Sequence, residues 1–192
     1  RGYVAVNGAL RTSNRRIWSA GDVSGLPQFT HIAGVNGSLA ATNAVLGMRR
    51  AVDVDAVPRV TFTHPEVAAV GLAAAEAVAA GCAVRQVQHS HTDRAIAEGS
   101  VEGFTRLVVD AKGRVRGAVI VGPRAGESIG EAALAVRQGI TTSAIASTTH
   151  PYPTYSDALW NAAVADVRVR LESGAVAGAI RMLARWRKFT TR

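Results

Sequence analysis

Two short motifs hold the polar side chains whose type and position suit chemistry. The first, residues 17–22, reads Ile-Trp-Ser-Ala-Gly-Asp, an apolar strand pattern that ends in Gly21 and Asp22. A carboxylate at the C-terminal edge of a strand lies where α/β folds bind ligands, and it can accept hydrogen bonds from the hydroxyls of a sugar alcohol. The glycine lets a ligand approach the backbone closely. Gly-Asp is also common in ordinary strand-to-loop turns, so this motif alone assigns no function.

The second motif, residues 150–157, reads His-Pro-Tyr-Pro-Thr-Tyr-Ser-Asp. Its two prolines predict a rigid, extended segment just before a helix. Thr154 or Ser156 could cap that helix, and Asp157 would lie in its first turn, where a negative charge is favoured. This capping interpretation accounts for every residue of the motif except Tyr152.

The first motif lies in a segment that is too short to form a domain by itself. Residues 3–6 and 16–20 are predicted as strands, and the alanine-rich residues 32–46 are predicted as a helix with a glycine stop. Two strands and one helix cannot close a core. We therefore expect residues 1–48 to be the C-terminal segment of a larger domain.

A linker at residues 49–58 is predicted to lead into a second domain, residues 59–170. Residues 104–110 and 115–121 alternate strongly and are joined by Ala-Lys-Gly, which indicates a hairpin. We expect an α/β (α+β) fold with a mostly antiparallel sheet flanked by helices. The other predicted strands are 60–63, 67–70 and 83–88, and the predicted helices are 73–80, 127–138, 141–146, 155–169 and 175–188.

The composition restricts the classes of function. The single cysteine, Cys82, can form neither an internal disulfide nor a cysteine-based metal site, and it suits a reducing cytoplasm. No stretch reaches the roughly 20 apolar residues of a membrane helix, and no secretory signal pattern is present. We therefore expect a cytoplasmic location, no metal site and no membrane partner.

The net charge of +8, from 22 basic and 14 acidic residues, is unevenly distributed. Residues 171–192 are predicted to form a basic C-terminal helix. The spacing of Ile180, Leu183 and Trp186 favours packing through these side chains, with the arginines in water. We therefore expect no nucleic-acid partner, and binding of nucleic acid or anionic lipid by this tail is the alternative.

Several segments together resemble the pyridine nucleotide–disulfide oxidoreductase family. Residues 10–14, 17–23 and 27–31 are similar to its second FAD motif, residues 61–71 to the start of its dimerisation domain, and residues 150–157 to its C-terminal catalytic motif. The resemblance implies the end of an FAD-binding domain followed by a dimerisation domain, and hence a homodimer. It is nearest to mercuric-reductase-like and dihydrolipoamide-dehydrogenase-like flavoproteins.

The resemblance also implies cofactor contacts. In the family, the aspartate at the place of Asp22 binds the ribityl chain of FAD, and Gly21 precedes it. The next helix points its N-terminus at the flavin, where Ile32 and Ala33 would supply backbone amides. Free amides at a positive helix end favour the negative charge of a reduced flavin. The sequence contains no GxGxxG fingerprint, so NAD(P)H would bind through a domain absent here.

The catalytic motif departs from the family pattern, His-x-His-Pro-Thr-x-x-Glu, at two positions. Tyr152 replaces the acid–base histidine, as it does in mercuric reductases, and Asp157 replaces the glutamate that orients it. A phenol with a pKa of about 10 is a poor proton shuttle at neutral pH, but it can donate a hydrogen bond or help to bind a soft metal ion beside thiolates. His150 is an alternative base, because residues i and i+2 share a side of an extended segment.

These features predict the C-terminal part of an FAD-dependent oxidoreductase. Electrons would pass from NAD(P)H through FAD and an upstream cysteine pair to a disulfide or metal-ion acceptor. Mercuric reductases carry a further cysteine pair near the C-terminus, and this sequence ends without one. The alternative is a non-catalytic dimerisation module that is inactive by itself.

Overall fold

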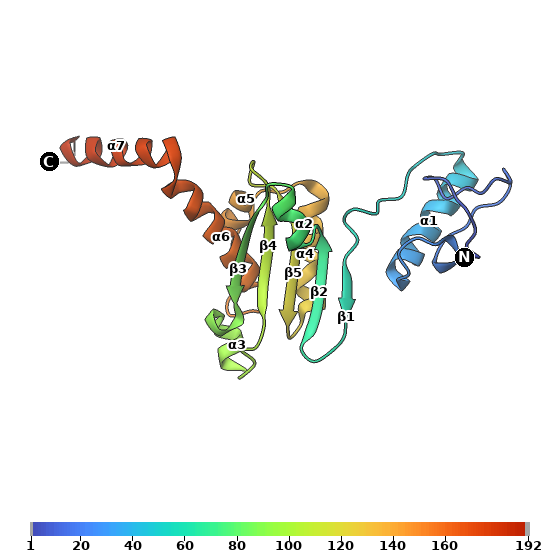
Figure 1. The fold of residues 1–192 in the computed structure, drawn as a ribbon, viewed down its shortest axis with the longest axis horizontal. Coiled ribbons are helices and arrows are strands. Elements are labelled where there is room, and N and C mark those ends of the chain that lie inside the picture. Colours follow the sequence, from blue (N-terminus) through green and yellow to red (C-terminus); the bar gives the residue numbers. More distant parts are fainter. Residues whose placement is uncertain (1, 191–192) are drawn as a thin grey trace. The chain divides into compact units, whose positions relative to one another are not determined.

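The chain divides into two compact units, Arg1–Val57 and Pro58–Arg192 (Figure 1). The computed structural model describes the backbone of residues 2–190 and the side chains of residues 2–173 and 177–187.

The first unit is built around helix α1, Thr30–Leu46, which follows the short 3-10 helix η1, Asp22–Ser24. α1 ends at Gly47, whose φ of 65° is a left-handed conformation that glycine adopts without strain. The structure thus confirms the predicted helix and its glycine stop. About one residue per turn of α1 is buried, and these residues are Ile32, Asn36, Ala40 and Asn43.

Asn43 ties α1 to the segments on either side of it. Its amide nitrogen donates to the carbonyls of Ala9, at 3.0 Å, and Arg50, at 2.9 Å. Its amide oxygen accepts from the backbone N–H of Arg50 at 3.1 Å. A buried amide is stable only when its polar atoms have partners, and Asn43 is 2% exposed. The side chain therefore fixes the fold of this unit.

The strands predicted at residues 3–6 and 16–20 are not formed. Among the described residues of the first unit, a single bridge between Arg11 and Trp18 is the only strand-like pairing. Tyr3 and Ile17 are 52% and 50% exposed in this chain. These segments make isolated backbone hydrogen bonds, such as that from the Ser19 N–H to the Leu10 carbonyl at 3.0 Å, and not the continuous ladder that a strand needs.

The second unit contains one antiparallel sheet, as predicted, and its strand order is β1-β2-β5-β4-β3 (Figure 1). β4 and β5 form the predicted hairpin, and Asp110 organises its turn by accepting from the N–H of Lys112 at 2.8 Å and of Arg114 at 3.0 Å. The strands are β1 Arg59–Thr61, β2 Glu66–Gly71, β3 Ala83–Gln88, β4 Phe104–Val109 and β5 Val115–Gly122.

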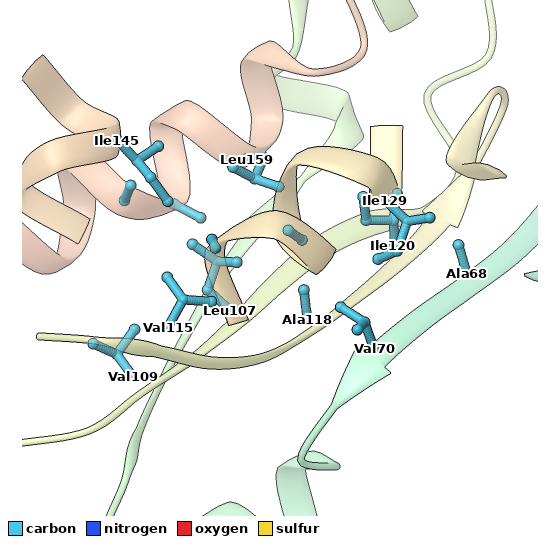
Figure 2. Packing of buried hydrophobic residues seen from close by; sticks show 14 of the residues in the cluster. Ala68, Val70, Leu107, Val109, Val115, Ala118, Ile120, Ile129, Ile145 and Leu159 are labelled. Atoms are coloured by element: carbon cyan, nitrogen blue, oxygen red, sulfur yellow. The ribbon is translucent and has the colours of Figure 1, made fainter. Parts of the chain in front are cut away.

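Helices α4 and α6 pack against this sheet and share one apolar core with it (Figure 2). α4 contacts β2 and β5, and α6 contacts β3 and β4. The helices contribute mainly alanines to the core, and small side chains let a helix approach a sheet closely. The helices are α2 Ala74–Ala79, α3 Asp93–Ala97, α4 Ala125–Gln138, α5 Thr142–Ser147, α6 Asp157–Glu172 and α7 Gly174–Thr190, with a 3-10 turn η2 at His89–His91.

The C-terminal helix forms as predicted, but its expected packing is absent. Ile180, Leu183 and Trp186 are 43%, 58% and 66% exposed. α7 packs against α6 and is separated from it by Ser173, which is extended. No helix in the described part of the chain is both long and apolar enough to cross a membrane.

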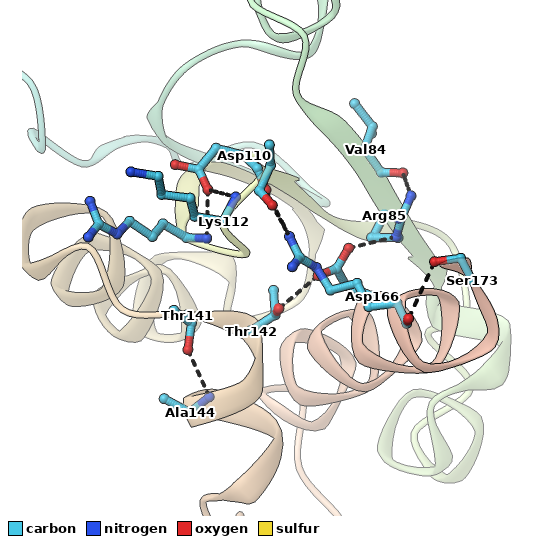
Figure 3. Close-up of polar contacts among 12 residues, drawn as sticks. Val84, Arg85, Asp110, Lys112, Thr141, Thr142, Ala144, Asp166 and Ser173 are labelled. Atoms are coloured by element: carbon cyan, nitrogen blue, oxygen red, sulfur yellow. Dashed lines mark hydrogen bonds and ion pairs between the residues drawn. The ribbon is translucent and has the colours of Figure 1, made fainter. Parts of the chain in front are cut away.

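The carboxylate of Asp166 on α6 is a buried charge, 1% exposed, that joins several elements (Figure 3). It forms an ion pair with Arg85 of β3 at 3.1 Å. It also accepts hydrogen bonds from Thr142 at 2.7 Å and Arg170 at 3.0 Å. Arg170 in turn donates to the carbonyls of Asp110 and Ala111, both at 3.0 Å. Thus α6 is attached to β3, to α5 and to the β4–β5 turn.

Asp166→Asn should lower the free energy of unfolding by about 3 kcal/mol, because it leaves two partly buried guanidinium groups without their shared counter-charge. Urea denaturation at a fixed protein concentration measures the change. The matched control is Glu172→Gln, an exposed acid on the same helix, which should change stability by no more than about 0.5 kcal/mol. Equal midpoints for the two variants would refute this role of Asp166.

Candidate active site

The second motif forms the loop between α5 and α6 and lines a pocket of about 360 Å³ at the start of α6. His150, Tyr152 and Asp157 all contribute to the pocket wall. The structure therefore brings together the three residues that the sequence nominates for catalysis. The rest of the wall comes from the end of α5, the loop itself and α6, namely Ala146, Ser147, Thr148, Thr149 and Trp160.

Tyr152 is oriented by Asp93, the first residue of α3. The tyrosine is 68% exposed, and its hydroxyl donates a hydrogen bond to a carboxylate oxygen of Asp93. This hydrogen bond and the charge of Asp93 raise the pKa of Tyr152, and burial and Asp157 add to the shift. The phenol therefore stays protonated at neutral pH. The Tyr152 hydroxyl uses its hydrogen to donate to Asp93, so the lone pairs of the phenol oxygen remain free to accept from another ligand.

His150 is held at both ring nitrogens. Nε2 lies 2.9 Å from the carboxylate of Glu131 on α4, and Nδ1 lies 2.9 Å from the carbonyl of Thr148. Burial by itself lowers the pKa of His150, but hydrogen bonds to Glu131 and Thr148 and the charges of Glu131 and Asp157 outweigh it, so the pKa is raised. With an acceptor at each nitrogen, the imidazolium form is favoured, and neither nitrogen is available as a base in this arrangement.

Asp157 begins α6, and its carboxylate accepts from the side-chain amide of Asn161 at 2.9 Å. Burial raises the pKa of Asp157, the hydrogen bond from Asn161 opposes that shift, and Asp93 adds to it. The predicted side-chain cap is not made by Ser156, which occupies the N-cap position. The hydroxyl of Thr154 instead donates to the carbonyl of Pro151 at 3.0 Å and pairs with the Ser156 hydroxyl, so these residues shape the loop.

Glu98, at the C-terminal end of α3, was not found from the sequence, and it anchors the same loop through Tyr155. It accepts from the hydroxyl of Tyr155 at 2.8 Å, from Arg94 at 2.6 Å and from Arg124 at 3.4 Å. The hydrogen bond from Tyr155, then that from Arg94, and the charges of Arg94 and Arg124 lower the pKa of Glu98. The four-residue spacing of Arg94 and Glu98 is the one signal in the sequence that could have revealed part of this cluster.

His89 is a second buried histidine, 1% exposed, and its environment is the opposite of that of His150. One ring nitrogen lies 3.0 Å from the hydroxyl of Thr105, and the other has no hydrogen-bond partner among the described residues. Burial lowers the pKa of His89, so the ring is neutral. A Cβ at Gly122 would overlap this ring, which explains the need for glycine there.

The residues nominated for cofactor binding lie together in the first unit. Gly21 has φ of 78° and packs against the first turn of α1, where a Cβ on Gly21 would lie 3.3 Å from the Cβ of Ala33. Asp22 follows in η1 and is exposed. Of the two expected amide donors, Ala33 is already engaged, because its N–H donates to the carbonyl of Phe29 at 2.9 Å. The backbone N–H of Ile32 lies in the first turn of α1, where amides have no carbonyl partner within the helix and can donate to a ligand.

These residues fit one side of a flavin site. An exposed carboxylate at position 22 can accept from hydroxyls, and the N-terminus of α1 provides the amides and positive potential that an anionic ring edge needs. A hollow of about 610 Å³ in the first unit is lined by other residues and does not include Gly21 or Asp22.

The antiparallel sheet with its alanine-rich helices, and the motif at the start of α6, match a known class of dimerisation domain. The profile for "Pyridine nucleotide-disulphide oxidoreductase, dimerisation domain" matches residues 57–163. The chain therefore belongs to this family.

Known relatives agree with this assignment. The mercuric reductase of Streptomyces lividans is 39% identical over 162 residues, which cover 83% of this chain and 34% of that protein. The dihydrolipoyl dehydrogenase of Haloferax volcanii is 40% identical over 167 residues, which cover 85% and 35% of the two chains. The chain thus spans about a third of the length of these relatives.

Solved structures share the fold. LpdA from Mycobacterium tuberculosis has a TM-score of 0.78 and 31% identity, and the match covers 84% of this chain and 36% of LpdA. The Cu(II) complex of the flavoprotein disulfide reductase RclA from Escherichia coli has the same TM-score of 0.78 at 23% identity, with 84% and 38% covered. At that identity the second match shows likeness of fold alone.

His150→Gln should remove a stabilisation that depends on pH. Because the pKa of His150 is raised by folding, its contribution is complete below the unfolded-state pKa of about 6.5 and is lost as the pH rises through the folded-state value. The difference in free energy of unfolding between wild type and variant should therefore shrink from about pH 5.5 to about pH 8.5 in urea titrations. The exposed His91→Gln should leave the wild-type pH profile in place. A difference that grows with pH would contradict the assignment.

Proposed function

We propose that this chain is the C-terminal part of an FAD-dependent oxidoreductase that passes electrons from NAD(P)H, through FAD and a cysteine pair, to a disulfide or metal-ion acceptor. The observation that carries the proposal is the exposed Tyr152, oriented by Asp93 in one pocket with Asp157 and His150. The family match supports it. The sequence has a single cysteine, Cys82, so the proposed pair would come from a part of the protein outside these residues. Such chemistry suits a reducing cytoplasm.

In this proposal the first unit binds part of the cofactor. FAD, when bound, supplies the electron-transfer chemistry. The Asp22 carboxylate accepts hydrogen bonds from the ribityl hydroxyls, and Gly21 leaves room for the ligand at the backbone. The N–H of Ile32 and the dipole of α1 favour negative charge at the ring edge. NAD(P)H binds through another domain.

The second unit would serve the site of the partner in a homodimer. The phenol oxygen of Tyr152 has its proton engaged by Asp93, so it offers lone pairs to a thiol proton or to a soft cation beside thiolates. Its raised pKa makes it a poor acid–base group, and His150 is a positioning residue that fixes the loop to α4. This arrangement favours a mercuric-reductase-like acceptor over exchange of a proton with a dithiol substrate.

Asp22→Ala in the full-length protein should weaken FAD retention by about 10-fold or more, which is the scale of a lost hydrogen bond to a charged group. The flavin absorbance that remains after desalting, and titration of the apoprotein with FAD, measure the change. Asp55→Ala, which removes an exposed carboxylate from the same unit, is the matched control. Flavin content equal to the control in the Asp22 variant would count against the flavin assignment.

Tyr152→Phe in the full-length enzyme should lower the rate of acceptor reduction about 10-fold or more, while reduction of the flavin by NAD(P)H is unchanged. Asp93→Asn should give an intermediate loss, because the phenol keeps its oxygen but loses the charge that orients it. Stopped-flow measurement of the two half-reactions separates these steps. Tyr155→Phe removes a phenol from the same loop and should affect stability more than rate. Full acceptor turnover in the Tyr152 variant would exclude the proposed role.

A further inference from the structure

Helix α7 carries its large apolar side chains and two of its arginines on opposite faces, although Arg187, seven residues after Ile180, falls on the apolar face. From residue 174 to the C-terminus the sequence has five basic residues and no acidic one. Within the described side chains, Ile180, Leu183 and Trp186 recur every three residues and so share one face. Arg181 and Arg185, four residues apart, lie on the opposite face and are exposed.

The apolar face of α7 is not used to pack the helix onto the domain. Ala177, which is 6% exposed, is the one residue of α7 that is buried among its described side chains. The three large apolar residues Ile180, Leu183 and Trp186 are between 43% and 66% exposed. Monomeric surfaces rarely expose contiguous large apolar side chains unless a partner covers them.

The break at Ser173 gives α7 a direction of its own. Ser173 has φ of −111° and ψ of 152°, an extended conformation that interrupts the helical path between α6 and α7. α6 is fixed by the Asp166 network, whereas α7 continues past this break and packs against α6, with Ala177 buried. The helix can therefore present its length to an external surface.

Charge and apolar content together select the kind of surface. A second copy of α7 would bring like charges together along two basic helices. A nucleic acid would engage the arginines but leave Ile180, Leu183 and Trp186 in water. An anionic lipid bilayer satisfies both faces, since a basic amphipathic helix buries its apolar side in the acyl boundary while long arginine side chains reach the headgroups. A tryptophan on the apolar side suits the interface between headgroup and acyl chain.

We propose that α7 binds in the plane of an anionic phospholipid surface and attaches the protein peripherally to it. Ile180, Leu183 and Trp186 enter the boundary of the acyl chains, and Arg181 and Arg185 interact with phosphate-bearing headgroups. This inference stands on α7 alone and does not depend on the proposed redox function. It concerns attachment to a membrane surface without a spanning helix, and it takes up the lipid alternative for the tail, because the packing through Ile180, Leu183 and Trp186 that was expected instead is not made.

Flotation of the full-length protein with large unilamellar vesicles tests the proposal. Wild type should bind vesicles of phosphatidylcholine mixed with phosphatidylglycerol, and should not bind vesicles of phosphatidylcholine alone. Arg181→Glu/Arg185→Glu should reduce partitioning about 10-fold or more, since each cation near an anionic surface contributes substantially to binding. Leu183→Asp should reduce it similarly through the apolar face, with helix content checked by circular dichroism.

The matched control is Arg15→Glu/Arg16→Glu, which makes the same change in net charge at exposed positions of the first unit. This control should keep vesicle binding within about twofold of wild type. Absence of binding to the anionic vesicles, or an equal loss in the control, overturns the proposal. Light scattering compares the molar mass of wild type and Leu183→Asp. If the variant has a lower oligomeric state, a second copy of the chain covers this face, and the membrane proposal is wrong.

Discussion

The buried carboxylate of Asp166 is the charge around which the second unit is arranged. Burial of an ion is costly unless every oxygen is paired, and here two arginines and one hydroxyl share the two oxygens. These partners come from β3, from α6 itself and from the start of α5. Because Asp166 keeps these partners only in one arrangement, its burial fixes the position and rotation of α6 against the sheet.

The position of α6 in turn determines the candidate site. Asp157 and Trp160 lie at the N-terminal end of the helix whose other half carries Asp166 and Arg170. Between them, Leu159, Ala162 and Ala163 are buried in the core shared with α4 (Figure 2). Any rotation of α6 that moved Asp166 from its partners would also turn Asp157 away from the pocket. The loop that carries Tyr152 is thus held at one end by α6 and at the other by α5.

Local patterns in the sequence reveal most of the second unit. Strand β3 and the β4–β5 hairpin follow from alternation and turn residues, and α1 and α4 follow from their glycine stops. α3 escaped prediction because it has five residues and is held by contacts made far along the chain. The strands expected near Tyr3 and Ile17 failed because these segments form turns and a single bridge instead of a continuous ladder.

The site was predictable only as far as its residues are neighbours in sequence. His150, Tyr152 and Asp157 share one loop, so the motif alone placed them together. Asp93 lies 59 residues before its partner Tyr152, and Glu98 lies 57 residues before Tyr155. No periodicity marks such pairs, because the sheet and α3, not the local chain, bring them into contact. The same holds for Glu131, which reaches His150 from α4.

The turn between β4 and β5 is held by hydrogen bonds to three of its carbonyls. Arg170 binds two of its carbonyls, and the backbone N–H of Thr142 donates to the carbonyl of Gly113 at 2.8 Å. A side chain at Gly113 would lie 3.1 Å from the guanidinium carbon of Arg170. Hairpin tips are usually the safest places to graft an epitope or a fusion partner. In this domain such a graft would displace Arg170, one of the counter-charges of the buried Asp166, so the interior restricts the length of this tip.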